Sequence, residues 1–209
     1  MKKTIAVMMA FCALPAFANY DYNYSYDGTP RRDTYVGFRV HKNENIAFRF
    51  EPENSEGTTL RDDGFGIGIN VGNRLTDNVK IEFETAYTGG RASKYGNDFE
   101  FNVWSNMLNV YVYKQFGGAV EPYGGFGIGI SGIWGNVDGA MNMSDSTADM
   151  SWAAMIGVNF ALNTRIDLNI GLKYQNYGDI EMRTDDDVVT STEIDGTEFY
   201  IGAVYKFGL

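Results

Sequence analysis

The stretch DGFGIGINVGNRLTDNVKIEFETAYTG, residues 63–89, decides the fold of this chain, because apolar and polar residues alternate along it with a period of two. Phe65, Ile67 and Ile69 fall on one face of an extended segment, and glycine or asparagine falls on the other. The same alternation resumes after the turn-forming residues 76–78. Successive side chains of a strand point to opposite faces, so the stretch predicts two antiparallel strands joined by a tight turn.

The same period-two pattern continues outward in both directions and predicts eight strands in all. They cover about 34–42, 64–74, 79–88, 101–116, 122–134, 150–162, 165–177 and 197–207, and the pattern leaves open whether the first strand ends near residue 42 or near residue 50. The expected connections alternate in length: long and polar at 51–63, 89–100, 135–149 and 179–195, short at 75–78, 117–121 and 163–164. This alternation predicts an up-and-down meander with its long loops at one end.

Composition narrows the class of protein. The chain has 209 residues, of which 44% are hydrophobic, and its mean hydropathy is −0.27. No stretch approaches the roughly 18 apolar residues that a membrane-spanning helix needs. Glycine (25 residues) and aromatic residues (15%) are both abundant, which favours strands and turns over long helices. The length fits one domain.

The N-terminus predicts export. Residues 1–18 carry two lysines, an apolar run over 5–14 and the small residues Ala16 and Ala18, so we expect a signal peptide cleaved after Ala18. Residues 19–33 form a tyrosine-rich segment that we interpret as a periplasmic leader, and residues 34–209 hold the eight predicted strands, which we expect to close into a barrel. Cys12 is the only cysteine and would be removed with the signal. Loss of the two lysines changes the formal charge from −10 to −12, which argues against nucleic-acid binding.

The alternating pattern does not say which face points outward, since a soluble barrel hides its apolar face and a membrane barrel exposes it to lipid. Three observations favour the membrane. The apolar face is nearly free of charge over nine to eleven residues per strand, the length that crosses a bilayer when tilted. The opposite face is rich in glycine, serine and asparagine. The tryptophans share the apolar parity near the long-loop end. We therefore predict an all-β fold, an eight-stranded antiparallel up-and-down transmembrane β-barrel.

Two groups of residues follow from this assignment. The residues that we expect to form a polar network in the lumen are Arg39, Lys80, Glu82, Glu84, Arg165, Asp167, Lys173, Glu198 and Lys206. The residues that we expect in aromatic girdles at the two membrane interfaces are Trp104, Trp134, Trp152, Tyr205 and Phe207. Charges in a narrow lumen are costly unless they are paired, so the network is either a structural plug or an ion path.

At this point the chain resembles the OmpA/OmpX/Opa-like family of eight-stranded outer-membrane β-barrels. Residues 63–89 resemble that family's second strand, turn and third strand, and EFYIGAVYKF (198–207) resembles its closing strand. The resemblance implies a bacterial outer-membrane location, contact with lipid and lipopolysaccharide, and handling by the outer-membrane assembly machinery. It also implies a role in surface structure or in adhesion to host or surface ligands.

Motifs for other chemistry are weak. Gly127, Gly129 and Gly132 match a dinucleotide fingerprint as a string, but they alternate within one predicted strand and no helix follows. His41, the only histidine, is not followed by the serine that lipid A deacylases carry in their His-x-Ser pair, so we expect a hydrogen-bonding role. The acidic run 185–187 lacks the spacing of a calcium loop. We expect no enzyme activity, cofactor or metal.

The predicted function is a surface protein with a structural or recognition role through four long extracellular loops. A small porin-like channel is the first alternative, and a lipid-modifying enzyme is the second.

Overall fold

The computed structural model describes residues 34–51, 58–76, 78–94, 97–114, 119–138, 143–163, 165–183 and 189–207. The predicted signal peptide and leader lie outside these residues. The strands are β1 (Thr34–Glu51), β2 (Thr58–Arg74), β3 (Val79–Lys94), β4 (Asn97–Tyr113), β5 (Val120–Asp138), β6 (Met143–Ala161), β7 (Ile166–Arg183) and β8 (Val189–Phe207). Within the described residues there is no helix long and apolar enough to cross a membrane.

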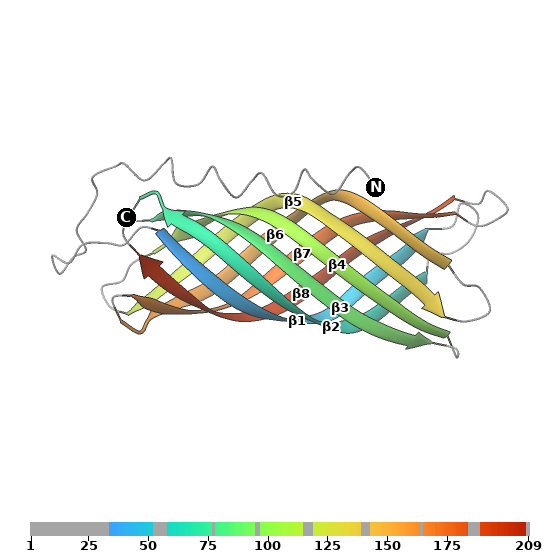
Figure 1. Cartoon of the computed structure of the whole chain (residues 1–209), viewed down its shortest axis with the longest axis horizontal. Coiled ribbons are helices and arrows are strands. Elements are labelled where there is room, and N and C mark those ends of the chain that lie inside the picture. The colour runs from blue at the N-terminus through green and yellow to red at the C-terminus, as the bar shows by residue number, and fades with distance from the viewer. Residues whose placement is uncertain are drawn as a thin grey trace.

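The eight strands form one closed barrel, in which each strand pairs with its sequence neighbour and β1 pairs with β8 (Figure 1). Every pairing is antiparallel. The predicted fold is therefore confirmed. The first strand takes the longer of its two predicted lengths, with an irregularity against β2 between Asn43 and Ile46.

The stagger of the strands fixes the width of the barrel. We followed directly paired residues from strand to strand once round the barrel. The path starts at Thr34 on β1 and returns to β1 at Glu44, so the stagger is ten residues. The residues along the path are Asn73, Ile81, Val110, Phe126, Ala154, Tyr174 and Thr197. With about 3.3 Å per residue and about 4.8 Å between strands, this stagger tilts the strands by about 40° and gives a backbone radius of about 8 Å. Such a lumen is narrow enough for side chains to fill.

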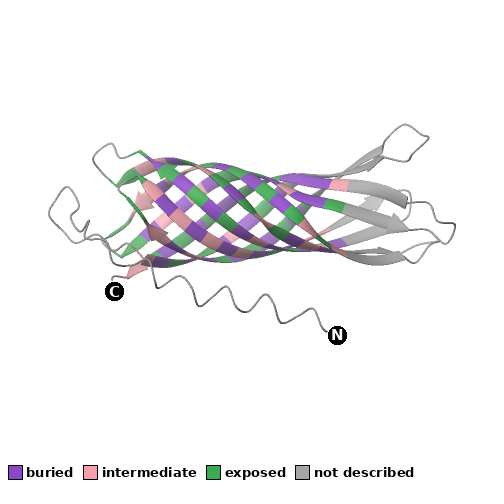
Figure 2. Cartoon of the chain, turned by 90° about the horizontal axis from the view of Figure 1, so that it is seen from above, coloured by how far each residue is buried: buried purple, intermediate pink, exposed green. Residues whose placement is uncertain are grey.

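Where burial is described, it alternates along the strands in step with the period-two pattern (Figure 2). Large apolar side chains point outward and are exposed, with Ile156 63% and Phe38 49% accessible. Most charged and amide side chains of the described wall point inward and are buried, including Glu82 at 1%. This arrangement is the reverse of a soluble barrel and suits a protein that is surrounded by lipid.

The strands are longer than predicted at the end where the long loops were expected. They have 16 to 19 residues each, and only residues 52–57, 95–96, 139–142 and 184–188 lie between them at that end. The prediction of four long loops is therefore wrong, because most of those residues continue the strands. At about 2.5 Å of axial rise per residue, the barrel is about 40–48 Å tall, whereas an outer-membrane apolar band is about 25 Å tall.

We call the strand residues beyond the apolar band the outer rim. They are 44–51, 58–63, 91–94, 97–100, 135–138, 143–149, 178–183 and 189–195.

Inward-facing glycines make room for aromatic rings of the neighbouring strand. Tyr111 pairs directly with Gly125, and a Cβ atom built on that glycine would lie 2.5 Å from the tyrosine ring. The pairs Tyr123–Gly157 and Tyr200–Gly171 repeat the arrangement, with predicted Cβ contacts of 2.4 and 2.5 Å. The glycine content of the inner face is thus a steric requirement, since these rings lie flat over glycine as they cross the lumen.

Ile156 lies in the middle of the outward apolar band, so replacing it tests the membrane assignment. We expect Ile156→Lys to lower the free energy of unfolding in lipid vesicles by about 2–4 kcal/mol, because the ammonium group must enter hydrocarbon. Urea titration measures the change. Ala148→Lys, an exposed position of the outer rim, is the matched control and should change stability by less than about 0.5 kcal/mol. Equal losses for both variants would contradict a lipid-facing band.

Candidate functional site

The centre of the lumen is organised around Arg39, which β1 projects inward. Its guanidinium Nη1 lies 2.6 Å from Glu82 Oε1 and also contacts Glu84, both on β3. The arginine Nε donates a 3.2 Å hydrogen bond to Asn169 Oδ1 on β7. Because β7 lies on the opposite side of β1 from β3, the arginine joins three parts of the barrel wall.

Glu82 is surrounded by donors. Tyr35 and Asn70 donate to its Oε2 at 2.8 and 2.7 Å, and the Tyr111 hydroxyl donates to its Oε1 at 3.0 Å. A buried carboxylate is stable only when its oxygens are paired and hydrogen-bonded, and these contacts satisfy both oxygens.

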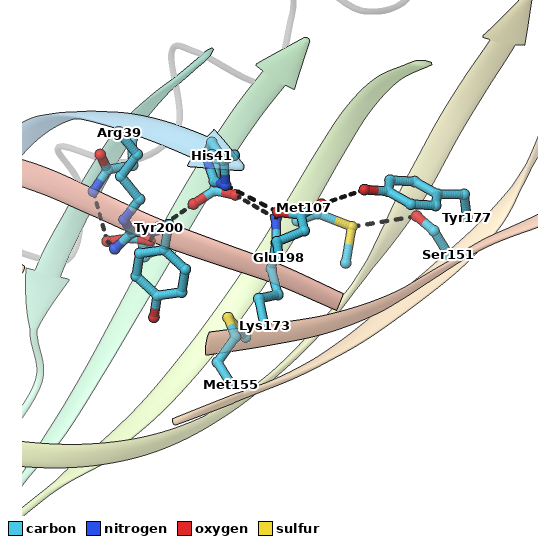
Figure 3. A network of polar contacts seen from close by, with 12 residues as sticks. Arg39, His41, Met107, Ser151, Met155, Lys173, Tyr177, Glu198 and Tyr200 are labelled. Atoms are coloured by element: carbon cyan, nitrogen blue, oxygen red, sulfur yellow. Dashed lines mark hydrogen bonds and ion pairs between the residues drawn. The ribbon is translucent and has the colours of Figure 1, made fainter. Parts of the chain in front are cut away.

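A second group continues the network towards the outer end of the barrel (Figure 3). Lys173 Nζ on β7 lies 3.2 Å from Glu84 Oε1 and 2.8 Å from Glu198 Oε2 on β8. His41 Nδ1 lies 2.9 Å from the same Glu198 oxygen, and the Tyr177 hydroxyl donates to the other. The carboxylates of Glu84 and Glu198 therefore link the two parts of one continuous assembly.

We call this assembly the lumen network. Its members are Arg39, His41, Glu82, Glu84, Lys173 and Glu198, and each has 3% or less of its surface exposed. Three carboxylates face two fixed cations and one histidine, so the charge nearly balances within the buried set.

The end of the lumen near the turns β2–β3, β4–β5 and β6–β7, which in outer-membrane barrels is the periplasmic end, has its own cross-links. Arg74 Nη2 on β2 lies 2.8 Å from Glu121 Oε2 on β5, two strands that are not neighbours, so this ion pair crosses the lumen. Lys206 Nζ lies 2.6 Å from Asp167 Oδ1. Lys80 Nζ lies 4.0 Å from the centre of the Tyr113 ring, which is a cation–π contact.

A group of apolar side chains lies above the lumen network, in the described part of the lumen. Phe101, Val103, Ile133, Tyr177 and Ile194 form a buried cluster there, which we call the apolar cluster. The period-two pattern did not predict this cluster. Phe101 and Val103 share the inward parity of Ser105, but parity does not show which inward side chains meet.

Eight of the nine residues predicted for the lumen project inward, in β1, β3, β7 and β8. Arg165 differs: it is exposed in the turn before β7, where its backbone carbonyl accepts a 2.7 Å hydrogen bond from Lys206. The prediction for Arg165 is wrong, because β7 begins one residue later, at Ile166, and Arg165 is not part of the barrel wall. The structure also adds Arg74, Glu121 and several tyrosines, and it gives His41, for which we expected a hydrogen-bonding role, a partner in Glu198.

The aromatic residues predicted for the girdles all lie on the outer face. Trp104 pairs with Gly132 and Trp152 with Ile128, so Trp134 lies two and six residues beyond those partners, closer to the outer rim. The indole of Trp104 donates to Thr85 Oγ1 at 2.7 Å, and Trp152 stacks against Phe126. Tyr205 and Phe207 lie on the outer face at the periplasmic end of β8.

The geometry around His41 does not fit a catalytic base. Its Nε2 has no hydrogen-bond partner and faces the wall, since a Cβ atom on Gly68 would lie 3.1 Å from it. No hydroxyl group of a described residue is hydrogen-bonded to this histidine, whereas a hydrolase would place a nucleophile there.

The other weak motifs gain no support in the part of the chain that the structure describes. The three glycines of the fingerprint lie inside β5, which continues as a strand to Asp138. Within the described ranges no group of three acidic, histidine or cysteine side chains could hold a metal ion, and residues 185–187 lie outside those ranges.

The network's contribution to stability can be measured. We expect Arg39→Met to lower the free energy of unfolding in detergent or lipid by about 3–5 kcal/mol, because two buried carboxylates lose their shared cation. Lys206→Met is the control: this lysine is 22% exposed and Asn159 still donates to Asp167 at 3.0 Å, so we expect a smaller loss of about 1 kcal/mol. If both variants lose the same free energy of unfolding, burial does not account for the stability that the network contributes.

Comparison with solved structures shows the same fold at low sequence identity. Neisserial surface protein A matches with a TM-score of 0.56 and 18% identity, covering 83% of this chain and 97% of the other. OprG from Pseudomonas aeruginosa matches with 0.57 and 14%, covering 86% and 98%, and AlkL, solved in lipid bilayers, with 0.58 and 16%, covering 91% and 98%. At these identities the likeness establishes the fold and no more.

No curated protein matches the chain at a significant level. A family model does: the outer membrane protein beta-barrel domain matches residues 4–207, which is nearly the whole sequence. The closed barrel, its lipid-facing apolar band and this match agree, and the chain belongs to the outer membrane protein beta-barrel domain family.

Proposed function

We propose that this protein is a non-enzymatic surface protein of the bacterial outer membrane, in which a filled barrel supports an outer rim that recognises ligands outside the cell. The observation that carries the proposal is the set of side-chain contacts across the lumen. The Arg74–Glu121 pair, the lumen network and the apolar cluster follow one another along the barrel axis.

These contacts support a structural role for the charges. Several ion pairs join strands that backbone hydrogen bonds do not join, as Arg39 on β1 does with Glu82 on β3 and Lys173 on β7 with Glu84 on β3. A side chain that moved aside for a passing ion would leave a buried charge without its partner, at a cost of several kcal/mol. The network therefore favours a rigid plug over a path.

The outer rim supports a role in recognition. Its strands continue for about 15–23 Å beyond the apolar band, by the difference between barrel height and band height. A membrane anchor alone does not need this extension. Neisserial surface protein A, which shares the fold, carries a surface location in its name, and we extend that location to this chain as part of the proposal.

A small channel is the second candidate, and one observation favours it. Several buried polar atoms of the described lumen have no hydrogen-bond partner, among them the side-chain amides of Asn43, Asn109 and Gln175. Unpartnered buried amides are costly and are usually satisfied by water. A file of water molecules past the Arg74–Glu121 pair, the lumen network and the apolar cluster would give the lumen a more continuous polar path.

Deletion of the outer rim tests the proposed function. Four variants each lose one outer hairpin, residues 45–62, 91–100, 136–147 or 179–193, and are displayed on bacteria that lack the protein. We expect at least one deletion to reduce binding to immobilised extracellular-matrix proteins or to other cells by tenfold or more, because the recognising surface is removed.

The control exchanges the periplasmic turn residues 76–78 for Asn-Gly and should leave binding unchanged. Heat-modifiable migration on gels shows that each barrel has still assembled. If all four assembled variants bind as well as the full chain, recognition by the outer rim is ruled out.

A further inference from the structure

Pairing between β6 and β7 stops halfway along both strands. The paired residues run from Ala161–Asp167 to Trp152–Asn176, and none of the described residues continues the pairing beyond that point. Both strands nevertheless go on. β6 remains paired with β5 as far as Met143, and β7 remains paired with β8 as far as Arg183. We call residues 143–149 of β6 and 178–183 of β7 the β6–β7 seam.

Specific residues end the pairing, so the seam is encoded in the sequence. The register of β7 against β8 shifts between Asn176 and Gly178, and Gly178 has a φ of 101°, which favours glycine. Asn176 Oδ1 accepts the Gly178 amide at 3.0 Å. Asp149 Oδ2 on β6 accepts the Asp179 amide at 2.8 Å, so a side chain takes a donor that a ladder bond would otherwise use. Above this contact the two strands present facing edges.

A second seam lies on the other side of the barrel. Pairing of β2 with β3 ends at Gly64–Gly90, although the strands extend to Thr58 and Lys94. The two seams are four strands apart in an eight-stranded barrel. They divide the outer rim into two four-stranded halves, β3 to β6 and β7 to β2.

The seams differ in charge. The β6–β7 seam contains Asp145, Asp149, Asp179, Glu181 and Arg183, four acids against one base. The β2–β3 seam contains Arg61, Asp62, Asp63, Arg91 and Lys94, two acids against three bases. An exposed strand edge accepts an extended peptide through main-chain hydrogen bonds, and charge selects which peptide. The longer and more acidic seam therefore favours a basic segment.

We propose that the β6–β7 seam binds an extended, lysine- or arginine-rich polypeptide segment of a partner, which adds as a strand between β6 and β7. Adjacent strands lie about 4.8 Å apart, so the added strand needs the two edges to separate to about 10 Å. The two hairpins that carry these edges, β5–β6 and β7–β8, are not paired with each other above Asp149. The proposal rests on the proposed function, since it names the partner chemistry that the outer rim recognises.

The test uses the full-length chain after removal of residues 1–18, refolded in lipid nanodiscs, and the eight-residue peptide KVKVKVKV. We expect binding, together with slowed hydrogen exchange of the backbone amides in 143–148 and 180–183. The same peptide with N-methyl groups on alternate residues has lost the donors of one edge and should bind at least tenfold more weakly. The acidic peptide EVEVEVEV should not compete.

A disulfide across the seam provides a matched control within the protein. The refolded chain contains no cysteine of its own. Oxidation of Thr147→Cys/Ile180→Cys should abolish peptide binding, and reduction should restore it. A disulfide at the paired positions Thr85→Cys/Asn106→Cys should leave binding unchanged.

Three results would overturn the proposal: equal binding of methylated and unmethylated peptides, binding that persists in the cross-linked seam, or self-association of the chain through the seam that the peptide does not displace. If the peptide test fails but the hairpin deletions still reduce cell binding, only the strand-addition mechanism is ruled out. If instead the peptide binds but all the hairpin deletions leave cell binding unchanged, the proposed function is ruled out.

Discussion

Every backbone amide and carbonyl that lies in hydrocarbon needs a hydrogen-bond partner within the protein, and the rest of this structure depends on that constraint. Closure of β1 on β8 meets it across the apolar band. With eight strands and a stagger of ten residues, closure also sets a radius of about 8 Å. The interior is therefore too narrow for a second layer of secondary structure, and side chains alone must fill it.

The filling explains the composition of the inner face. Tyrosine rings lie over cross-strand glycines, so one residue supplies the volume that its neighbour leaves out. Buried carboxylates alternate with cations from strands on other sides of the barrel, as Glu84 does with Arg39 and Lys173. These contacts brace the wall across its diameter, which backbone pairing between neighbouring strands cannot do. A rigid wall in turn can hold the outer rim far above the membrane, with its two seams in fixed positions.

The period-two pattern predicted the eight strands and which residues share a face of the wall, because in a strand parity decides orientation. The charge-free length of the apolar face, the small polar residues opposite it and the tryptophans then indicated which face points outward. The pattern could not predict which side chains meet. Arg74 and Glu121 form an ion pair only because the stagger of the strands brings β2 and β5 opposite each other at the periplasmic end. The alternation of apolar and polar residues contains no information about this stagger. The placement of Trp134 nearer the outer rim depends on the same quantity.

The outer rim escaped prediction for a different reason. Outside the membrane both faces of a strand can be polar, so the alternation fades in stretches such as 143–149, and polar residues resemble loops. Backbone pairing with β5, which the pattern cannot register, keeps these residues extended. Arg165 shows the opposite error. The alternation included it in the predicted strand, but β7 begins one residue later, at Ile166.

The central claim is that the lumen network plugs the barrel, and single-channel recording in planar lipid bilayers tests it most directly. The full chain after removal of residues 1–18 should show no steady ion conductance. Glu82→Gln and Lys173→Met should not remove a conductance, since none exists to remove. Steady openings of the unmodified protein that disappear in either variant would show that these charges line an ion path, and would contradict the account.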